Sequence, residues 1–142
     1  MDLEKFKPLL RKHEGLRLKP YRCTAGKLTI GYGRNLDDRG ITEEEAERLL
    51  HNDILLCSLQ LDRDLPWWKH HPENVQMVLM DMCFNLGITG LLEFKPTLGY
   101  IRDQKYSVAA VEMLKSKWAQ QVGPRAKELS VLIQNANQET NP

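Results

Sequence analysis

The chain has 142 residues, 42% of them hydrophobic and 27% charged, with a net charge of +1; these proportions are typical of a folded globular protein and exclude a disordered chain. No apolar run approaches the roughly 20 residues of a membrane-spanning helix, and the first residues lack the apolar segment of a signal peptide, so we expect neither. Three cysteines, an odd number, favour a reducing cytosol over a disulfide framework.

The charges are distributed unevenly along the chain. Residues 1–34 carry a net charge of +6, residues 35–64 carry −6, and residues 65–142 carry +1. A basic N-terminal block suits an anionic polymer as the partner. Nucleic acid is not favoured as that polymer, because the block lacks interleaved aromatic residues and any recognition-helix or finger motif.

A first helix is predicted from Asp2, as its N-cap, to about His13 or Glu14, with Gly15 as its C-terminal cap. Spacings of three and four residues place four positions on one face of this helix: Leu3, Phe6, Leu10 and Glu14. At the C-terminal end of an apolar stripe, Glu14 is expected to be partly desolvated and near the negative pole of the helix. Both effects favour the protonated carboxyl, which is the form a general acid requires. The alternative is a structural ion pair between Glu14 and a nearby Lys or Arg.

A β-hairpin is predicted next, with strands at 17–22 and 28–32 joined by a turn at 24–27. Cys23 and Thr29 share one face of an antiparallel pair only if the loop between the strands has an odd number of residues, and we expect three. A two-residue turn would send the two side chains to opposite faces. Gly31 and Gly33 indicate either a bulge or a close approach of the backbone to another group.

A long helix is predicted over residues 43–64. Thr42 and Glu45 form a capping box at its start, and Leu65-Pro66 ends it. Six residues make its apolar stripe: Ala46, Leu49, Leu50, Ile54, Cys57 and Leu61. At about 1.5 Å per residue, 22 residues span roughly 33 Å, which is long for so small a protein and indicates a connection between two lobes.

The remainder is predicted to be helical. A strong apolar stripe from Val75 to Leu86 ends at Gly87, and short helices are expected at 91–94 and 96–103. Ser107 is predicted to cap a further helix, and the last helix follows Gly123-Pro124. We expect Trp67 and Trp68 to pack in the core or between lobes rather than to form a platform for a carbohydrate.

Three residue types occur at two fixed gaps: Glu14, then eight residues, Cys23, then five residues, Thr29. This spacing, with the surrounding segments 13–19 and 29–33, resembles the signature of the phage-type lysozymes, the T4-like family (glycoside hydrolase family 24), in which the middle residue is Asp or Cys. Segments 85–90, 115–118 and 124–127 resemble the same family.

The resemblance implies an α+β, mainly α fold in a single lysozyme domain with two lobes. Its parts would be an N-terminal lobe with a small sheet (1–42), a connecting helix (43–64) and a helical C-terminal lobe (65–142). It implies an endolysin, a muramidase that hydrolyses the β-1,4 bond between N-acetylmuramic acid and N-acetylglucosamine in peptidoglycan. It also implies a monomer without metal or cofactor, made in the host cytoplasm and reaching the periplasmic wall with the help of a holin.

The family pattern further implies roles for individual residues. Glu14 would protonate the leaving oxygen, while Cys23 and Thr29 position or activate water, with inversion at the anomeric carbon. Substrate would be bound by Phe84, Thr97 and Arg125, with Phe84 facing the cleft and Arg125 reaching back toward Glu14.

Several alternatives remain open at this point. A lytic transglycosylase would need only the one acid, and an inactive wall-binding protein would need none. Cys23 could act as a base, a water-orienting group or a nucleophile. A zinc amidase is not favoured, because the four His and three Cys show neither Cys-x-x-Cys nor His-Glu-x-x-His spacing, and Cys57 and Cys83 fall on apolar stripes.

Overall fold

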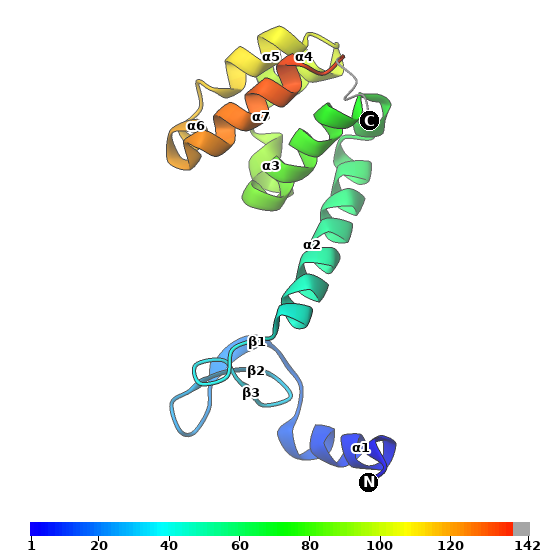
Figure 1. Ribbon diagram of the computed structural model, residues 1–142, viewed down its shortest axis with the longest axis vertical. Helices are drawn as coiled ribbons and strands as arrows, with labels where there is room; N and C mark the ends of the chain where they lie inside the picture. The colour runs from blue at the N-terminus through cyan, green and yellow to red at the C-terminus, as the bar shows by residue number, and fades with distance from the viewer. Residues whose placement is uncertain (138–142) are drawn as a thin grey trace. The chain divides into compact units, whose positions relative to one another are not determined.

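The computed structural model describes residues 1–137 and confirms the predicted α+β, mainly helical class (Figure 1). In this part of the chain there are seven α-helices, one short 3-10 helix and one three-stranded antiparallel sheet, which lies near the N-terminus. The chain divides into two compact units, Met1–Leu49 and Leu50–Pro142. Each unit is described here by itself.

The first unit begins with α1 (Leu3–Glu14), whose two ends are capped as predicted. The Asp2 carboxylate accepts a hydrogen bond from the backbone N–H of Glu4 at 2.9 Å. At the other end Gly15 adopts a φ of +69°, and its N–H donates to the carbonyl of Arg11 at 2.9 Å. Glu14 is therefore the last residue of the helix, immediately before the chain turns into the sheet.

The sheet has the order β1-β2-β3, formed by β1 (Arg17–Arg22), β2 (Leu28–Gly31) and β3 (Arg34–Asn35). The first two strands agree with the predicted hairpin. The third strand was not predicted, because two polar residues show no alternation from which a strand could be recognised. Pairing with the edge of β2, at Thr29↔Asn35 and Ile30↔Arg34, makes them a strand.

The long helix α2 (Glu43–Asp64) carries the predicted capping box. The Thr42 N–H donates to Glu45 Oε1 at 2.9 Å, and the Glu45 N–H donates to Thr42 Oγ1 at 3.1 Å. The Glu45 carboxylate also accepts two hydrogen bonds from the Arg34 guanidinium, at 2.8 and 2.7 Å. This bidentate pair fastens β3 to the first turn of α2.

The second unit consists of helices packed around one hydrophobic core (Figure 1). Its elements are the 3-10 helix η1 (Trp68–His70), α3 (Glu73–Leu92), α4 (Lys95–Arg102), α5 (Tyr106–Met113), α6 (Lys117–Val122) and α7 (Pro124–Gln134), with α5 packed against both α4 and α7. Two predictions of detail were wrong. The short helix expected at 91–94 is instead the last part of α3 after Gly87, which ends at Leu92 and leaves Glu93 and Phe94 outside it, and Ser107 lies inside α5. The side-chain cap in this region is Ser116, which accepts from the Ala119 N–H at 3.1 Å.

The helix α3 is long and apolar enough by composition to cross a membrane, which the reading of the sequence did not anticipate. However, Gly87 interrupts it with a φ of +75° and non-helical geometry, as the predicted stop at this residue requires. Residues 73–86 alone are too few to span a bilayer, and the apolar stripe of this segment is buried in the core of the unit. Its apolar character is therefore that of a core helix.

The tryptophans and two of the cysteines belong to the same core. Trp68 is buried and donates its ring N–H to Asp62 at 2.7 Å, and Trp67 packs against the core from its edge. Cys57 and Cys83 are buried free thiols, as their places on apolar stripes predicted.

Candidate active site

The carboxyl group of Glu14 lies against the backbone of the turn that joins β2 to β3. A Cβ atom built on Gly33 would lie 2.6 Å from Glu14 Oε2 and 3.1 Å from its Cδ, so the carboxyl fits here only because residue 33 has no side chain. Of the two alternatives predicted for Gly31 and Gly33, a bulge or a close backbone approach, the close approach is found at Gly33 and not at Gly31. Glu14 is otherwise exposed, so residues 1–49 do not themselves supply the desolvation that the apolar stripe predicted.

Cys23 follows β1 at the mouth of the hairpin loop. Its backbone N–H donates to the Lys27 carbonyl at 2.9 Å, and its own carbonyl accepts from the Gly26 N–H at 2.8 Å. The nearby backbone N–H groups of Lys27, and next of Ala25, lower the pKa of the Cys23 thiol, while burial opposes them. The loop thus favours a thiolate more than an ordinary exposed site would.

Thr29 is 3% exposed and is the one buried residue among residues 1–49. Its hydroxyl donates to the Lys27 carbonyl at 2.9 Å and lies beside the Cys23 thiol, for which it is a further hydrogen-bonding partner. A hydroxyl has only one hydrogen, so donation to the Lys27 carbonyl competes with donation to the Cys23 sulfur, and it is the bond to the sulfur that lowers the pKa of the thiol.

The register of the hairpin explains why these two side chains meet. Tyr21 pairs with Thr29 and Arg22 pairs with Leu28, which leaves a three-residue loop, 24–26, between Cys23 and Lys27. Cys23 and Thr29 therefore lie diagonally on one face of the sheet. The predicted odd-numbered loop is confirmed.

Two acidic residues for which the sequence predicted no role stabilise this hairpin. Asp37 accepts a hydrogen bond from the Leu28 N–H at 2.7 Å and lies 3.5 Å from the Arg22 guanidinium, while Asp38 pairs with Lys27 at 3.1 Å. Both aspartates come from the polar stretch after β3. Nothing in its local pattern reveals that it folds back onto the strand start, so only the three-dimensional structure identifies them.

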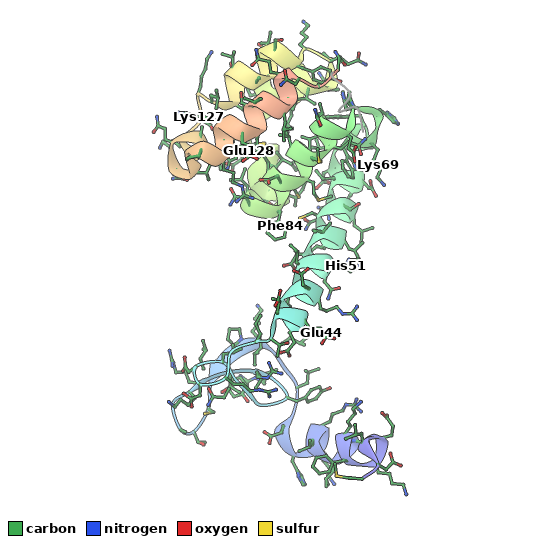
Figure 2. The ribbon with its side chains drawn as sticks, in the orientation of Figure 1. Glu44, His51, Lys69, Phe84, Lys127 and Glu128 are labelled. Atoms are coloured by element: carbon green, nitrogen blue, oxygen red, sulfur yellow. The ribbon has the colours of Figure 1, made fainter. Side chains whose placement is uncertain are left out.

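The three residues expected to bind substrate all belong to the second unit. Phe84 projects from α3 and is 43% exposed (Figure 2). Arg125, on α7, directs its guanidinium to Asp81 on α3, with Nε and Nη2 each 2.8 Å from Oδ1. Its expected reach toward Glu14 stays a prediction.

Thr97, in the first turn of α4, is 3% exposed and lines a cavity of about 400 Å³. The cavity floor is apolar, with Leu86, Phe94 and Trp118. Its rim carries charges of both signs: Glu93, Glu112, Lys115 and Lys117. Phe84 and Arg125 do not line it.

A family model described as phage lysozyme matches residues 11–139, which is most of the chain. The chain belongs to the phage lysozyme family. It is therefore a glycoside hydrolase of the lysozyme class, whose substrate is peptidoglycan.

Individual members of the family agree with this assignment over nearly the whole length. The chain is 33% identical to an endolysin of Acyrthosiphon pisum secondary endosymbiont phage 1, covering 86% of this chain and 84% of that protein. It is 27% identical to the probable T4-type lysozyme 1 of Dictyostelium discoideum, covering 91% and 93%. A SAR-endolysin of bacteriophage PS119 is 33% identical over 52% of this chain and 46% of its own.

Proposed function

We propose that this phage-type lysozyme is an endolysin in which Glu14 is the general acid and Cys23 and Thr29 handle the attacking water. The observation that carries the proposal is the convergence of all three on one small sheet. Glu14 rests on the β2–β3 turn, Thr29 is part of β2, and Cys23 opens the loop that leads into β2.

In the proposed reaction the bond between the anomeric carbon of N-acetylmuramic acid and the bridging oxygen of N-acetylglucosamine breaks. The Glu14 proton passes to that oxygen as it leaves, and water attacks the anomeric carbon from the opposite face of the ring. The configuration at that carbon inverts, because water arrives opposite the leaving group in a single displacement.

Cys23 and Thr29 act in this scheme by holding the water and stabilising the developing positive charge. The backbone N–H groups near Cys23 lower the pKa of the thiol and so favour its ionised form, and the Thr29 hydroxyl is held by its bond to Lys27. A thiolate held beside a hydroxyl can orient a water molecule and accept its proton. Direct attack by sulfur would instead give a thioglycoside and retention of configuration.

Substrate contacts outside the sheet are proposed for Phe84, Thr97 and Arg125. Phe84 offers an exposed aromatic face of the kind on which a sugar ring can stack, and Thr97 borders a cavity with charged groups at its rim. Arg125 supplies a guanidinium whose position is set by Asp81. The positive charge of residues 1–34 would add a general attraction to the anionic wall polymer.

The biological setting is proposed to be that of a phage endolysin acting as a monomer. The protein would be made in the host cytoplasm and would reach the periplasmic wall when a holin opens the inner membrane. The support is its similarity to an endolysin over most of both chains.

The decisive experiment is mass analysis of purified peptidoglycan after digestion. A muramidase releases fragments that end in reducing N-acetylmuramic acid, and proton NMR at early times would show the inverted anomer first. Fragments that end in the anhydro sugar would identify a lytic transglycosylase instead. Binding to the wall with no fragments at all would identify an inactive wall-binding protein.

A further inference from the structure

Seven glycines of this chain adopt a positive φ, but Gly33 is distinguished by what lies over it. Its φ is +78°, and a Cβ there would meet Oε2, Cδ and Cγ of Glu14 at 2.6, 3.1 and 3.5 Å. Gly31, two residues earlier, has a φ of +69°, and a Cβ built on it would have no contact within 4 Å. Backbone conformation alone accounts for the glycine at 31, whereas at 33 the space is also occupied by a carboxyl group.

The turn that carries Gly33 is tied to the rest of the site by the sheet. Ile30 pairs with Arg34 and Thr29 pairs with Asn35, so residues 31–33 form a short connection of fixed register. The Arg34 guanidinium is in turn held by Glu45 with two hydrogen bonds. The surface on which the Glu14 carboxyl rests is therefore fixed relative to Thr29, while Glu14 itself is the exposed end of a helix with few restraints of its own.

We propose that Gly33 is a positioning residue for Glu14. Because it lacks a side chain, the carboxyl group can pack against the backbone of the β2–β3 turn, and this contact sets the position of the acid relative to Thr29. The kinetic part of the proposal rests on the proposed function of Glu14. The contact itself does not.

The physical consequence of a side chain at residue 33 follows from what it would strike. The atoms in the way belong to the far end of a flexible glutamate, so the carboxyl can rotate away and the fold can survive. A displacement of about 1 Å is enough to cost a catalysed reaction on the order of 10²-fold. The substitution should therefore damage turnover more than it damages stability.

The experiment compares Gly33→Ala with Gly31→Ala, a matched control two residues earlier at the end of β2. Both place an alanine at positive φ and so carry similar backbone strain, but only the first meets Glu14. We expect both variants to lose similar stability in urea unfolding. The kcat on peptidoglycan should fall by about 10- to 100-fold for Gly33→Ala, with KM changed less than about threefold, and should change less than about threefold for Gly31→Ala.

A second readout does not depend on activity. The side-chain carboxyl carbon of Glu14 can be observed by NMR in protein labelled with ¹³C-glutamate and assigned by its disappearance in Glu14→Gln. Gly33→Ala should shift this resonance and Gly31→Ala should leave it in place. If Gly33→Ala fails to fold, Gly33→Asn and Gly31→Asn repeat the comparison, because asparagine tolerates positive φ while adding the same Cβ.

The outcomes separate the two proposals. A kcat for Gly33→Ala within threefold of the wild type, or an equal loss of kcat in Gly31→Ala, would overturn the positioning role. An unshifted Glu14 resonance in Gly33→Ala would overturn the contact. If the resonance shifts but Glu14→Gln is fully active, the contact stands and it is the assignment of Glu14 as the acid that is wrong.

Discussion

The two units of this lysozyme use different forces to hold their residues in place. Every buried apolar side chain in the described part of the chain belongs to residues 50–137, where the C-terminal part of α2, five further α-helices and one 3-10 helix enclose a single core. Residues 1–49 contain one buried residue, the polar Thr29, and are shaped by helix caps, short turns and ion pairs.

The comparison indicates that the chemistry and the hydrophobic stability are assigned to different parts of the sequence. The proposed acid, thiol and hydroxyl all lie in the unit with the least apolar burial. Hydrogen bonds and caps fix direction well but contribute only about 1 kcal/mol each, whereas buried apolar side chains contribute more. Substitutions of the proposed catalytic residues in the first unit should therefore affect activity at little cost in stability, whereas substitutions in the apolar core of the second unit should chiefly lower stability.

The largest effect is expected from Glu14→Gln, which removes the proton donor and keeps the shape of the side chain. Turnover should fall by at least about 10²-fold, because general acid catalysis contributes about 10² to 10⁴. The urea midpoint should stay near that of the wild type, since the side chain is exposed. Lysis of permeabilised Gram-negative cells measures the activity, and near-normal lysis by the folded variant would show that Glu14 is not the acid.

The second unit is tested with a pair of leucines. Leu79 is 0% exposed and Leu18, in β1, is 80% exposed. Leu79→Ala should lower the free energy of unfolding by about 2–5 kcal/mol through lost burial and a residual cavity, while Leu18→Ala should change it by less than about 0.5 kcal/mol. Equal losses in the two variants, measured by urea unfolding, would contradict the division of roles between the units.

The features that sequence reasoning found and missed follow the same division. Local patterns were enough for the caps at Asp2, Gly15 and Thr42, and the parity of the hairpin was enough to bring Cys23 and Thr29 together. These features depend on residues close in sequence, where periodicity and turn chemistry carry the information.

Contacts between residues distant in sequence were not predicted as pairs. The Glu14–Gly33 contact, the Arg34–Glu45 ion pair and the Asp37–Leu28 hydrogen bond each join segments nine or more residues apart. Each partner has an ordinary local explanation, as a helix end, a polar loop or a capping residue. The pairing depends on how the elements fold back, which local patterns do not report.

Cys23 is expected to tolerate substitution better than Glu14, because its proposed role is to support the water. Cys23→Asp should keep or raise the activity, since an aspartate is fully ionised at neutral pH whereas an ordinary thiol is mostly protonated, and Cys23→Ser should keep part of it. Mass spectrometry of the wild-type enzyme during turnover supplies the check. An inactive but folded Cys23→Asp, together with a glycosyl adduct on Cys23, would make the thiol a nucleophile and our mechanism wrong.

A smaller effect is expected in the chemical reactivity of the same thiol. Because the backbone N–H groups of Lys27 and Ala25 lower the pKa of Cys23, alkylation by iodoacetamide should reach half its maximal rate at a pH below the ordinary thiol value of 9.0. The other two thiols serve as internal controls, since both are buried and burial raises the pKa of Cys83 to about 12. Labelling of Cys57 or Cys83 as fast as Cys23 in the folded protein would contradict the prediction.

The smallest effect concerns the ion pair that fixes the turn beneath Glu14. The Arg34 guanidinium, followed by the Thr42 N–H, lowers the pKa of Glu45 from 4.5 to about 2. A carboxyl whose pKa is lower in the folded state stabilises the fold above its unfolded pKa, and this contribution disappears as the pH falls from about 4.5 toward about 2. Since Glu45 is partly exposed, solvent screening keeps the effect modest.

Wild-type protein should therefore lose more stability between pH 5 and pH 3 than Glu45→Gln. The control is Glu44→Gln, one residue away and outside this set of hydrogen bonds, which should behave like the wild type. If urea unfolding gives the same pH dependence of the free energy of unfolding for Glu45→Gln as for the wild type, the Arg34–Glu45 pair does not stabilise the turn. The position of the turn beneath the Glu14 carboxyl would then depend on the sheet alone.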